Sequence, residues 1–285
     1  MTNSELVADV KASNPILLVY PAGTGGEHIT AAISDASPSV RKAESTIQAS
    51  NNQVFYHSVF DYAPSFIDYD DPTTWINPMY KHNPDAHGRY FIKDHPTDLL
   101  LQSYGKHMPD IQVIYSVPQT KTVYFSELAH YKLGKRMVPN ELTDEFFHEA
   151  VSKNMEVYQK SVIRIWAARQ KEFWKHEIDI VFHKLKLGEN IKEYETMSLQ
   201  EHISLNAQYC ENMKRHVLAE YPKVFKNFST INCDTLADPS RVGEYWKQMA
   251  QIIPDLQPRI AIRKSEAWAR KNNEFLGRTK YGNQE

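Results

Sequence analysis

The sequence has little cysteine, almost no net charge and no long hydrophobic run. Among its 285 residues are two cysteines, Cys210 and Cys233, which make neither a disulfide framework nor the spacing of a metal site. This usage favours a reducing compartment, so we expect a cytoplasmic protein. The net charge of −2 argues against nucleic acid and anionic membranes as partners.

Other absences narrow the class of protein further. No apolar run approaches membrane-spanning length, and the polar start MTNSELVADVKASN is not typical of a signal peptide. The 12 histidines are scattered, with no pair that indicates a metal site, so we expect no metal. Hydrophobic residues make up 41% and charged residues 24% of the chain, as in ordinary soluble domains. The length suits one large α/β domain or two small ones, and we expect a single domain over residues 1–285.

What the sequence does contain is a strand that runs directly into glycines. Residues 16–20 are a continuous apolar run, the pattern of a strand buried on both faces, and Pro21 ends it. Gly23, Gly25 and Gly26 permit close backbone approach, and apolar residues then recur at helical spacing. This combination favours an anion site, because free N–H groups and the helix dipole point at the same place.

The glycine loop lacks both standard nucleotide signatures. No Lys-Ser or Lys-Thr pair follows the glycines as in the nucleotide P-loop, and the G-x-G-x-x-G spacing of dinucleotide folds is also missing. Two alternatives therefore stay open. One is a turn that binds nothing, and the other is a divergent nucleotide kinase or NTPase with a degenerate phosphate loop.

Three more strands are predicted, at 89–93, 111–115 and 228–233. The alternation of strands and helices predicts an α/β fold, a parallel β-sheet flanked by helices on both faces. Ligands of such sheets bind beyond the carboxyl ends of the strands, so we expect the loops PAGTGG, KDHP and SVPQT to converge on one crevice. The predicted helices are a short one from residue 97 and longer ones at 119–133, 143–176, 198–220 with Pro222 just beyond it, 238–253 and 259–277.

Two regions interrupt this alternation. Residues 38–88 form an irregular insertion rich in aromatics, Asp, Asn and Pro, and residues 140–222 are largely helical. Tyr and Trp stack well on flat or sugar-like faces, although aromatic side chains also simply pack. The insertion therefore favours a small-molecule or carbohydrate-like partner, which would be the acceptor if the protein transfers a group.

The order of these pieces resembles the sulfotransferase family. The family loop P-K-S-G-T-T-W corresponds to Pro21–Gly26, and the family sequence K-T-H corresponds to Lys93–His95. Its strand end I-Y-V-V-R-N-P-K-D corresponds to residues 113–120, and its late Y-E-D-L-x-x-D-P to residues 232–239. The resemblance covers most of the chain and implies a P-loop NTPase-like, sulfotransferase-like fold. It also implies transfer of a sulfuryl group from 3′-phosphoadenosine 5′-phosphosulfate to a hydroxyl or amine.

The chain departs from the family at two cationic donor contacts. Ala22 stands where the family has its phosphate-binding Lys, and Ser116 where it has the Arg that holds the donor's 3′-phosphate. Charge-assisted contacts are the stronger ones, so altered donor binding and a non-catalytic binding or structural relative are alternatives. The resemblance implies that the donor is bound by Ala22, Gly23, Thr24, Gly25, Gly26, Ser116, Arg263 and Lys264.

The C-terminal segment could supply the missing cations. Between residues 259 and 280 there are seven basic residues against two acidic ones, and a basic C-terminal segment folds over the donor in the family. The alternative is a solvated, charged helix. Trp268 in this segment could stack on an adenine or belong to the core. Thr24 could likewise donate to a phosphate or simply stabilise its turn.

Sulfuryl transfer requires in-line alignment, charge stabilisation on the leaving phosphate and a base near the acceptor. The resemblance implies that His95 is this base, and Lys93 would share its strand face and offer a positive charge. Glu27 is the second candidate base, and a protonated His28 could offset its charge. The alternatives are a His95 that merely caps or packs beside the next proline and a solvated Lys93.

Overall fold

The computed structural model describes residues 2–21, 24–41, 68–76, 87–94, 96, 100–118, 211 and 214–277. The predictions for Ala22, Gly23 and His95, and for the helices at 119–133 and 143–176, lie outside these residues. Most of the predicted insertion and of the long helical region also lie outside them.

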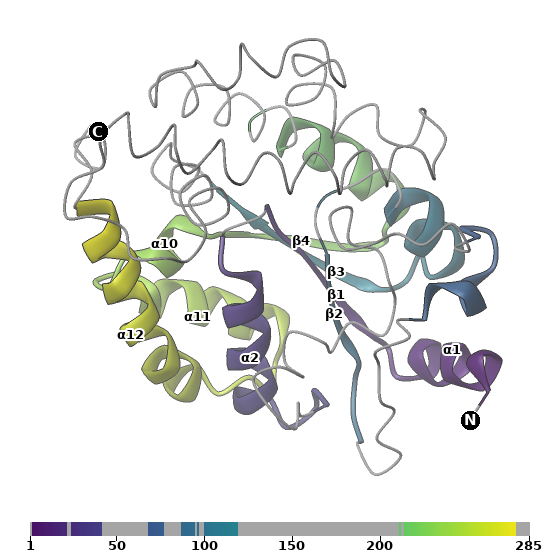
Figure 1. The fold of residues 1–285 in the computed structure, drawn as a ribbon, viewed down its shortest axis with the longest axis horizontal. Helices are drawn as coiled ribbons and strands as arrows, with labels where there is room; N and C mark the ends of the chain where they lie inside the picture. Colours follow the sequence, from purple (N-terminus) through teal and green to yellow (C-terminus); the bar gives the residue numbers. More distant parts are fainter. Residues whose placement is uncertain are drawn as a thin grey trace, which may run out of the picture.

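The centre of the described part is a four-stranded sheet in which all strands run parallel (Figure 1). The strands are β1 (Ile16–Val19), β2 (Phe91–Asp94), β3 (Gln112–Val117) and β4 (Asn227–Asn232), in the order β2-β1-β3-β4. Every residue of β1 and β2 is buried. The predictions of a parallel α/β sheet and of a first strand buried on both faces are therefore confirmed.

Two strands extend further than their apolar runs indicate. β2 continues through Asp94, which pairs in register with Val19 of β1. β3 continues through Val117, which pairs with Asn232 of β4. Main-chain pairing with a neighbouring strand decides where a strand ends, and it includes residues whose side chains are polar. Ser116 therefore lies within the sheet and not in the loop that follows it.

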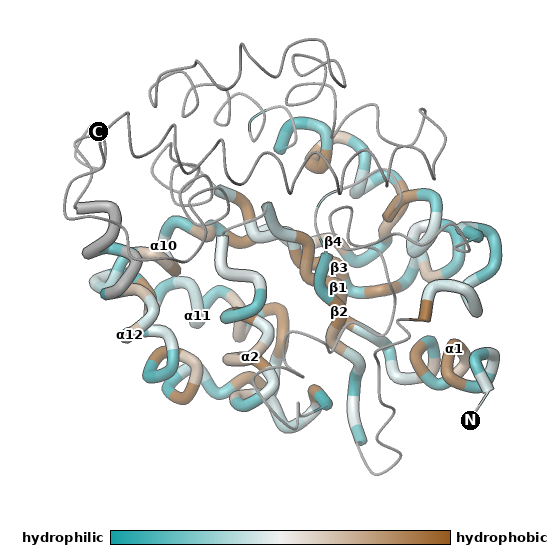
Figure 2. The backbone as a smooth tube through the Cα atoms, viewed as in Figure 1, coloured by the Kyte–Doolittle hydropathy of each residue, from teal (hydrophilic) through white to brown (hydrophobic). Residues whose placement is uncertain are grey.

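Helices cover both faces of this sheet (Figure 1). α2 (Gly26–Ala36), α11 (Val242–Ile252) and α12 (Pro258–Gly277) pack on one face, and α1 (Asn3–Ala12) and the helix at 214–224 pack on the other. Hydrophobic residues follow the strands and the sides of the helices that face them (Figure 2). Each fully buried Leu or Ile in these two layers contributes about 1.5–3 kcal/mol to stability.

The helices at the C-terminus agree with the sequence pattern in part. The predicted basic helix is confirmed as α12, which ends at Gly277 as expected. The predicted helix at 238–253 is preceded by a short one, α10 (Asp234–Ala237), and begins later, at Val242. Asp238 accepts hydrogen bonds from the main chain and the hydroxyl of Ser240, at 2.8 and 2.7 Å. This local turn delays the start of α11.

The prediction that a helix stops before Pro222 is wrong. The helix continues to residue 224, although proline removes one main-chain hydrogen bond. Tyr221 and Phe225, on either side of the proline, are both buried in the core of that sheet face. Their burial outweighs the lost bond, since a helix interior proline costs about 3 kcal/mol and each buried aromatic contributes a comparable amount.

The sequence pattern also left out α1, which buries Leu6, Val7 and Val10. Its start carries a capping box, in which the Thr2 hydroxyl accepts from the Glu5 N–H and the Glu5 carboxylate accepts from the Thr2 N–H. The T-x-x-E spacing of this box is visible in the sequence and is the signal that could have revealed the helix.

Candidate functional site

The strand register brings the ends of β1, β2 and β3 to one edge of the sheet. β1 lies between the other two strands, and Val19 pairs with both Asp94 and Tyr115. The N–H of Tyr20 then donates to the Asp94 carbonyl, at 3.1 Å. The glycine loop therefore leaves the sheet from its middle, between the ends of the two strands whose last residues begin the other candidate segments.

Within the loop, Thr24 is held by its own turn. Its hydroxyl donates to the Pro21 carbonyl at 2.6 Å, and its N–H donates to the same oxygen at 3.2 Å. The side chain is buried. In this structure the hydroxyl stabilises the turn, the second of the two roles expected for it.

Gly25 ends the loop and caps α2 in the left-handed conformation, at φ 88°. Glycine adopts this conformation without strain, which explains its presence there. No side chain among the described residues caps this helix end. The positive end of the α2 dipole therefore faces the loop without a side-chain acceptor.

The close packing of two aromatic rings also explains why positions 25 and 26 are glycine. A Cβ at Gly26 would lie 2.1 Å from the ring of Tyr20, and a Cβ at Gly25 would lie 2.8 Å from the ring of Trp268. No side chain fits at such distances without displacing a ring. The close approach of Tyr20 and Trp268 thus requires glycine at both positions whether or not a ligand binds.

Lys93 and Glu27 are brought together across this edge. Lys93 pairs in register with Leu18 and faces the layer of α2, where its Nζ lies 3.7 Å from Glu27 Oε1. The Lys93 side chain is 7% exposed, whereas that of Glu27 is 65% exposed. The expectation of a solvated Lys93 is wrong, because the end of β2 is covered by the first turn of α2. His95, the predicted base, lies outside the described residues.

Ser116, the residue expected at the 3′-phosphate, faces α11. It is fully buried, and its hydroxyl lies 3.5 Å from the hydroxyl of Tyr245. Burial raises the pKa of Tyr245 far above its ordinary value, so this phenol stays neutral. Ser116 and Tyr245 thus place two neutral hydroxyl groups between β3 and α11, and neither supplies the positive charge that the Arg of the sulfotransferase family would bring.

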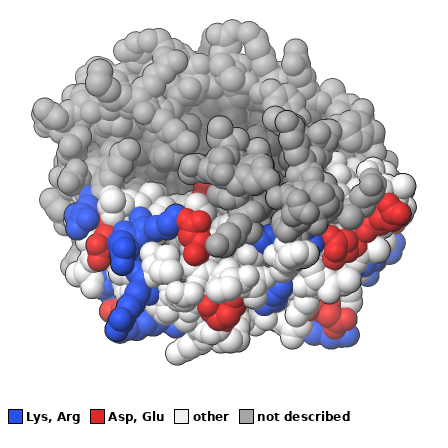
Figure 3. Space-filling view, turned by 90° about the horizontal axis from the view of Figure 1, so that it is seen from below, with Lys and Arg blue, Asp and Glu red and all other residues white. Residues whose placement is uncertain are grey.

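The two predicted C-terminal cations are not drawn to the loop in the described structure. Lys264 forms an ion pair with Asp35, near the end of α2 that is remote from the glycines. Arg263 is exposed on α12. Basic side chains gather on the α12 side of the described surface, with acidic ones among them (Figure 3).

His28, in contrast, belongs to a buried polar network that sequence reasoning missed. Its Nε2 lies 2.8 Å from the Ser265 hydroxyl, which also accepts a hydrogen bond of 2.8 Å from the Trp246 indole N–H. The Ser265 hydroxyl has one proton and two lone pairs, so after accepting from Trp246 it can either donate to His28 or accept from it, according to the histidine tautomer. Burial, assisted by the charge of Lys264, lowers the pKa of His28 to about 4. The expectation that a protonated His28 offsets Glu27 is therefore wrong.

Asp94 is a second feature that the sequence pattern did not single out. It is buried at the end of β2, next to the predicted base. Burial and the Asp94 charge both raise the pKa of Tyr104 well above its ordinary value. Aspartate is rarely fully buried unless it is paired or functional. The sequence signal at position 94 was therefore an Asp that directly follows the buried residues of a strand.

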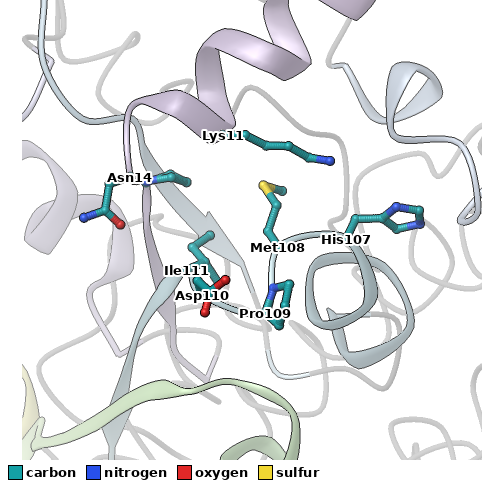
Figure 4. Close-up of a pocket in the computed structure, with 8 residues that line it drawn as sticks. Lys11, Asn14, His107, Met108, Pro109, Asp110 and Ile111 are labelled. Atoms are coloured by element: carbon teal, nitrogen blue, oxygen red, sulfur yellow. The ribbon is translucent and has the colours of Figure 1, made fainter.

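A pocket of about 240 Å³ lies at the opposite edge of the sheet (Figure 4). It lies between the residues that precede β1 and those that precede β3. Because ligands of parallel sheets bind at the carboxyl edge, this pocket is separate from the candidate site. Its lining residues are Lys11, Asn14, Pro15, His107, Met108, Pro109, Asp110 and Ile111.

No protein family, curated protein or solved structure matches this chain in the three comparisons made. Within the described ranges, no cluster of three or more His, Cys, Asp or Glu side chains is suited to holding a metal ion. None of the helices in these ranges is long and apolar enough to cross a membrane.

Proposed function

We propose that the protein is a sulfotransferase-like enzyme that binds a phosphate-bearing donor at the carboxyl edge of its sheet. The donor class is 3′-phosphoadenosine 5′-phosphosulfate, and the acceptor is a hydroxyl or amine. The observation that carries the proposal is the placement of Lys93, a buried ammonium at the end of β2, beside the first turn of α2. A buried cation next to a helix N-terminus favours a multiply charged anion.

The strand order supports the same proposal. The glycine loop leaves the sheet between β2 and β3, the two strands whose last residues begin the segments KDHP and SVPQT. His95 follows β2 directly in the sequence, and in the proposed reaction it is the base that takes the acceptor proton. Lys93 would stabilise negative charge on the transferring group and would compensate for the alanine at position 22.

Calorimetry with 3′-phosphoadenosine 5′-phosphate tests donor binding. We expect saturable binding by the wild-type protein and binding at least about tenfold weaker in Lys93→Met, which keeps the length of the side chain but removes its charge. Lys223→Met is the matched control, since Lys223 is exposed and already paired with Glu220. The absence of binding at millimolar ligand would refute the proposal.

One observation favours a second candidate function, a non-catalytic binding or structural protein of similar fold. The rings of Tyr20 and Trp268 lie against Gly26 and Gly25, the two glycines of the loop that the structure describes, and explain both of them without a ligand. Sulfate transfer assays separate the two functions. Transfer that disappears in His95→Ala supports the enzyme, and saturable donor binding without transfer supports the non-catalytic protein.

A further inference from the structure

We infer that Glu27 is an internal counter-ion for Lys93, which a ligand anion must displace before it can bind. This inference rests on the proposed function, because it concerns the anion site at the same sheet edge. It assigns Glu27 a role in setting affinity and charge selectivity, different from the role of base that the sequence suggested.

The two partners of this ion pair differ sharply in burial. The Lys93 side chain is 7% exposed and the Glu27 side chain is 65% exposed. A buried ammonium is costly unless an opposite charge compensates it, so Lys93 requires an anion nearby. A carboxylate that is mostly exposed is well solvated and loses little when it turns away into water. The cation is therefore the fixed partner, and the anion is the exchangeable one.

The length of the contact indicates a loose pair. The distance from Lys93 Nζ to Glu27 Oε1 is 3.7 Å, whereas a charge-assisted N–H···O bond measures about 2.7–2.9 Å. A phosphate oxygen at the shorter distance would gain a stronger contact with the same ammonium. Glu27 also lies in the first turn of α2, where the helix dipole favours negative charge. Its carboxylate thus occupies the kind of position that the phosphate would take.

Displacement has a consequence for selectivity. A singly charged anion replaces Glu27 with no gain in charge next to Lys93, whereas a multiply charged one adds negative charge beside both the ammonium and the helix end. Competition with Glu27 therefore selects against small monovalent anions and in favour of the phosphate end of a nucleotide.

Calorimetric titration with pyrophosphate tests this inference on four proteins: wild type, Glu27→Gln, Lys93→Met and the double variant. We expect Glu27→Gln to bind pyrophosphate about tenfold more tightly than wild type, because the internal competitor has lost its charge. In the Lys93→Met background the same substitution should have almost no effect, since the cation that Glu27 pairs with in the described structure is gone. Circular dichroism melting curves verify that each variant is folded.

Glu244→Gln is the matched control. Glu244 is also an exposed glutamate in the first turn of a helix, and it pairs with Arg241 at 2.9 Å. We expect its loss to leave pyrophosphate affinity unchanged. If Glu27→Gln gains equally with and without Lys93, then Glu27 acts only by general repulsion, and the counter-ion role is refuted.

The outcomes also separate this inference from the proposed function. Binding by wild type that is not tightened in Glu27→Gln refutes the counter-ion role and leaves the anion site in place. Binding that is detectable only in Glu27→Gln supports both. No binding by any of the four proteins refutes both.

Discussion

The indole of Trp268 stacks on the imidazole of His28, with ring centroids 5.0 Å apart and an interplanar angle of 7°. The same indole approaches Gly25, so one side chain of α12 covers both the end of the glycine loop and the first turn of α2. This contact, together with the hydrogen bond between His28 and Ser265, fixes α12 beside the candidate site. The stability of the carboxyl edge of the sheet therefore depends on contacts between residues that are far apart in the sequence.

Titration of His28 should make the protein less stable in mild acid. Its pKa is about 4 in the folded protein and 6.5 without burial, so between these values the unfolded state binds the extra proton. Stability should therefore decrease as the pH falls from about 6.5 to about 4, by up to roughly 3 kcal/mol from this group. Urea denaturation of wild type and His28→Gln over this range measures the effect. An equal pH dependence in the two proteins would contradict it.

Loss of the Ser265 hydroxyl should destabilise the fold. Ser265 is fully buried and hydrogen-bonds both the Trp246 indole and the His28 imidazole. Ser265→Ala leaves the buried Trp246 N–H and the partly buried His28 imidazole without this partner, and we expect a loss of about 1–3 kcal/mol in unfolding free energy. Ser240→Ala is the control, because this hydroxyl is exposed and its removal should change stability by about 0.5 kcal/mol or less. Equal effects of the two substitutions in thermal or urea denaturation would argue against the network.

A methyl group at Gly26 should be poorly tolerated. It would lie 2.1 Å from the buried ring of Tyr20, and we expect Gly26→Ala to lower the unfolding free energy by about 1–3 kcal/mol. Gly243 in α11 is the matched position, since the nearest atom to its added Cβ is 3.8 Å away. Gly243→Ala should be neutral or stabilise by about 0.5–1 kcal/mol. If both substitutions change the unfolding free energy equally little, the Tyr20 ring can move to accommodate the methyl group, and its position does not require glycine at residue 26.

Removal of the Lys93 charge should weaken anion binding more than it weakens the fold. Lys93→Met keeps an unbranched side chain in the same buried space, and its partner Glu27 is mostly exposed. The remaining carboxylate is therefore hydrated, and we expect a change in unfolding free energy of about 1 kcal/mol or less. Parallel urea denaturation and calorimetry with 3′-phosphoadenosine 5′-phosphate compare the two effects. A loss of several kcal/mol would assign Lys93 a mainly structural role.

Much of the fold was readable from local patterns. The apolar run at 16–20 predicted a doubly buried strand, and the alternation of strands and helices predicted the parallel sheet that the structure contains. The T-x-x-E spacing at Thr2 also encodes the start of α1. Pro222 does not end its helix as its sequence position predicts, because its local effect is opposed by the burial of its neighbours, which depends on packing against the sheet.

The candidate site was readable in its components but not in its contacts. Glycines after a buried strand indicate close backbone approach, yet only the tertiary structure identified the rings of Tyr20 and Trp268 as what approaches. Lys93 appeared as a strand-end lysine that could equally be solvated, and its burial depends on α2.

The sequence by itself determined the order of strands and helices and the loops at the strand ends, because these follow from side-chain periodicity and from the backbone preferences of Gly and Pro. Only the tertiary structure decided which groups carry charge and which face each other. His28 and Ser265 are 237 positions apart, and Glu27 meets Lys93 from a different element. Burial and the pairing of charges arise from the packing of distant segments, so no local pattern could specify them.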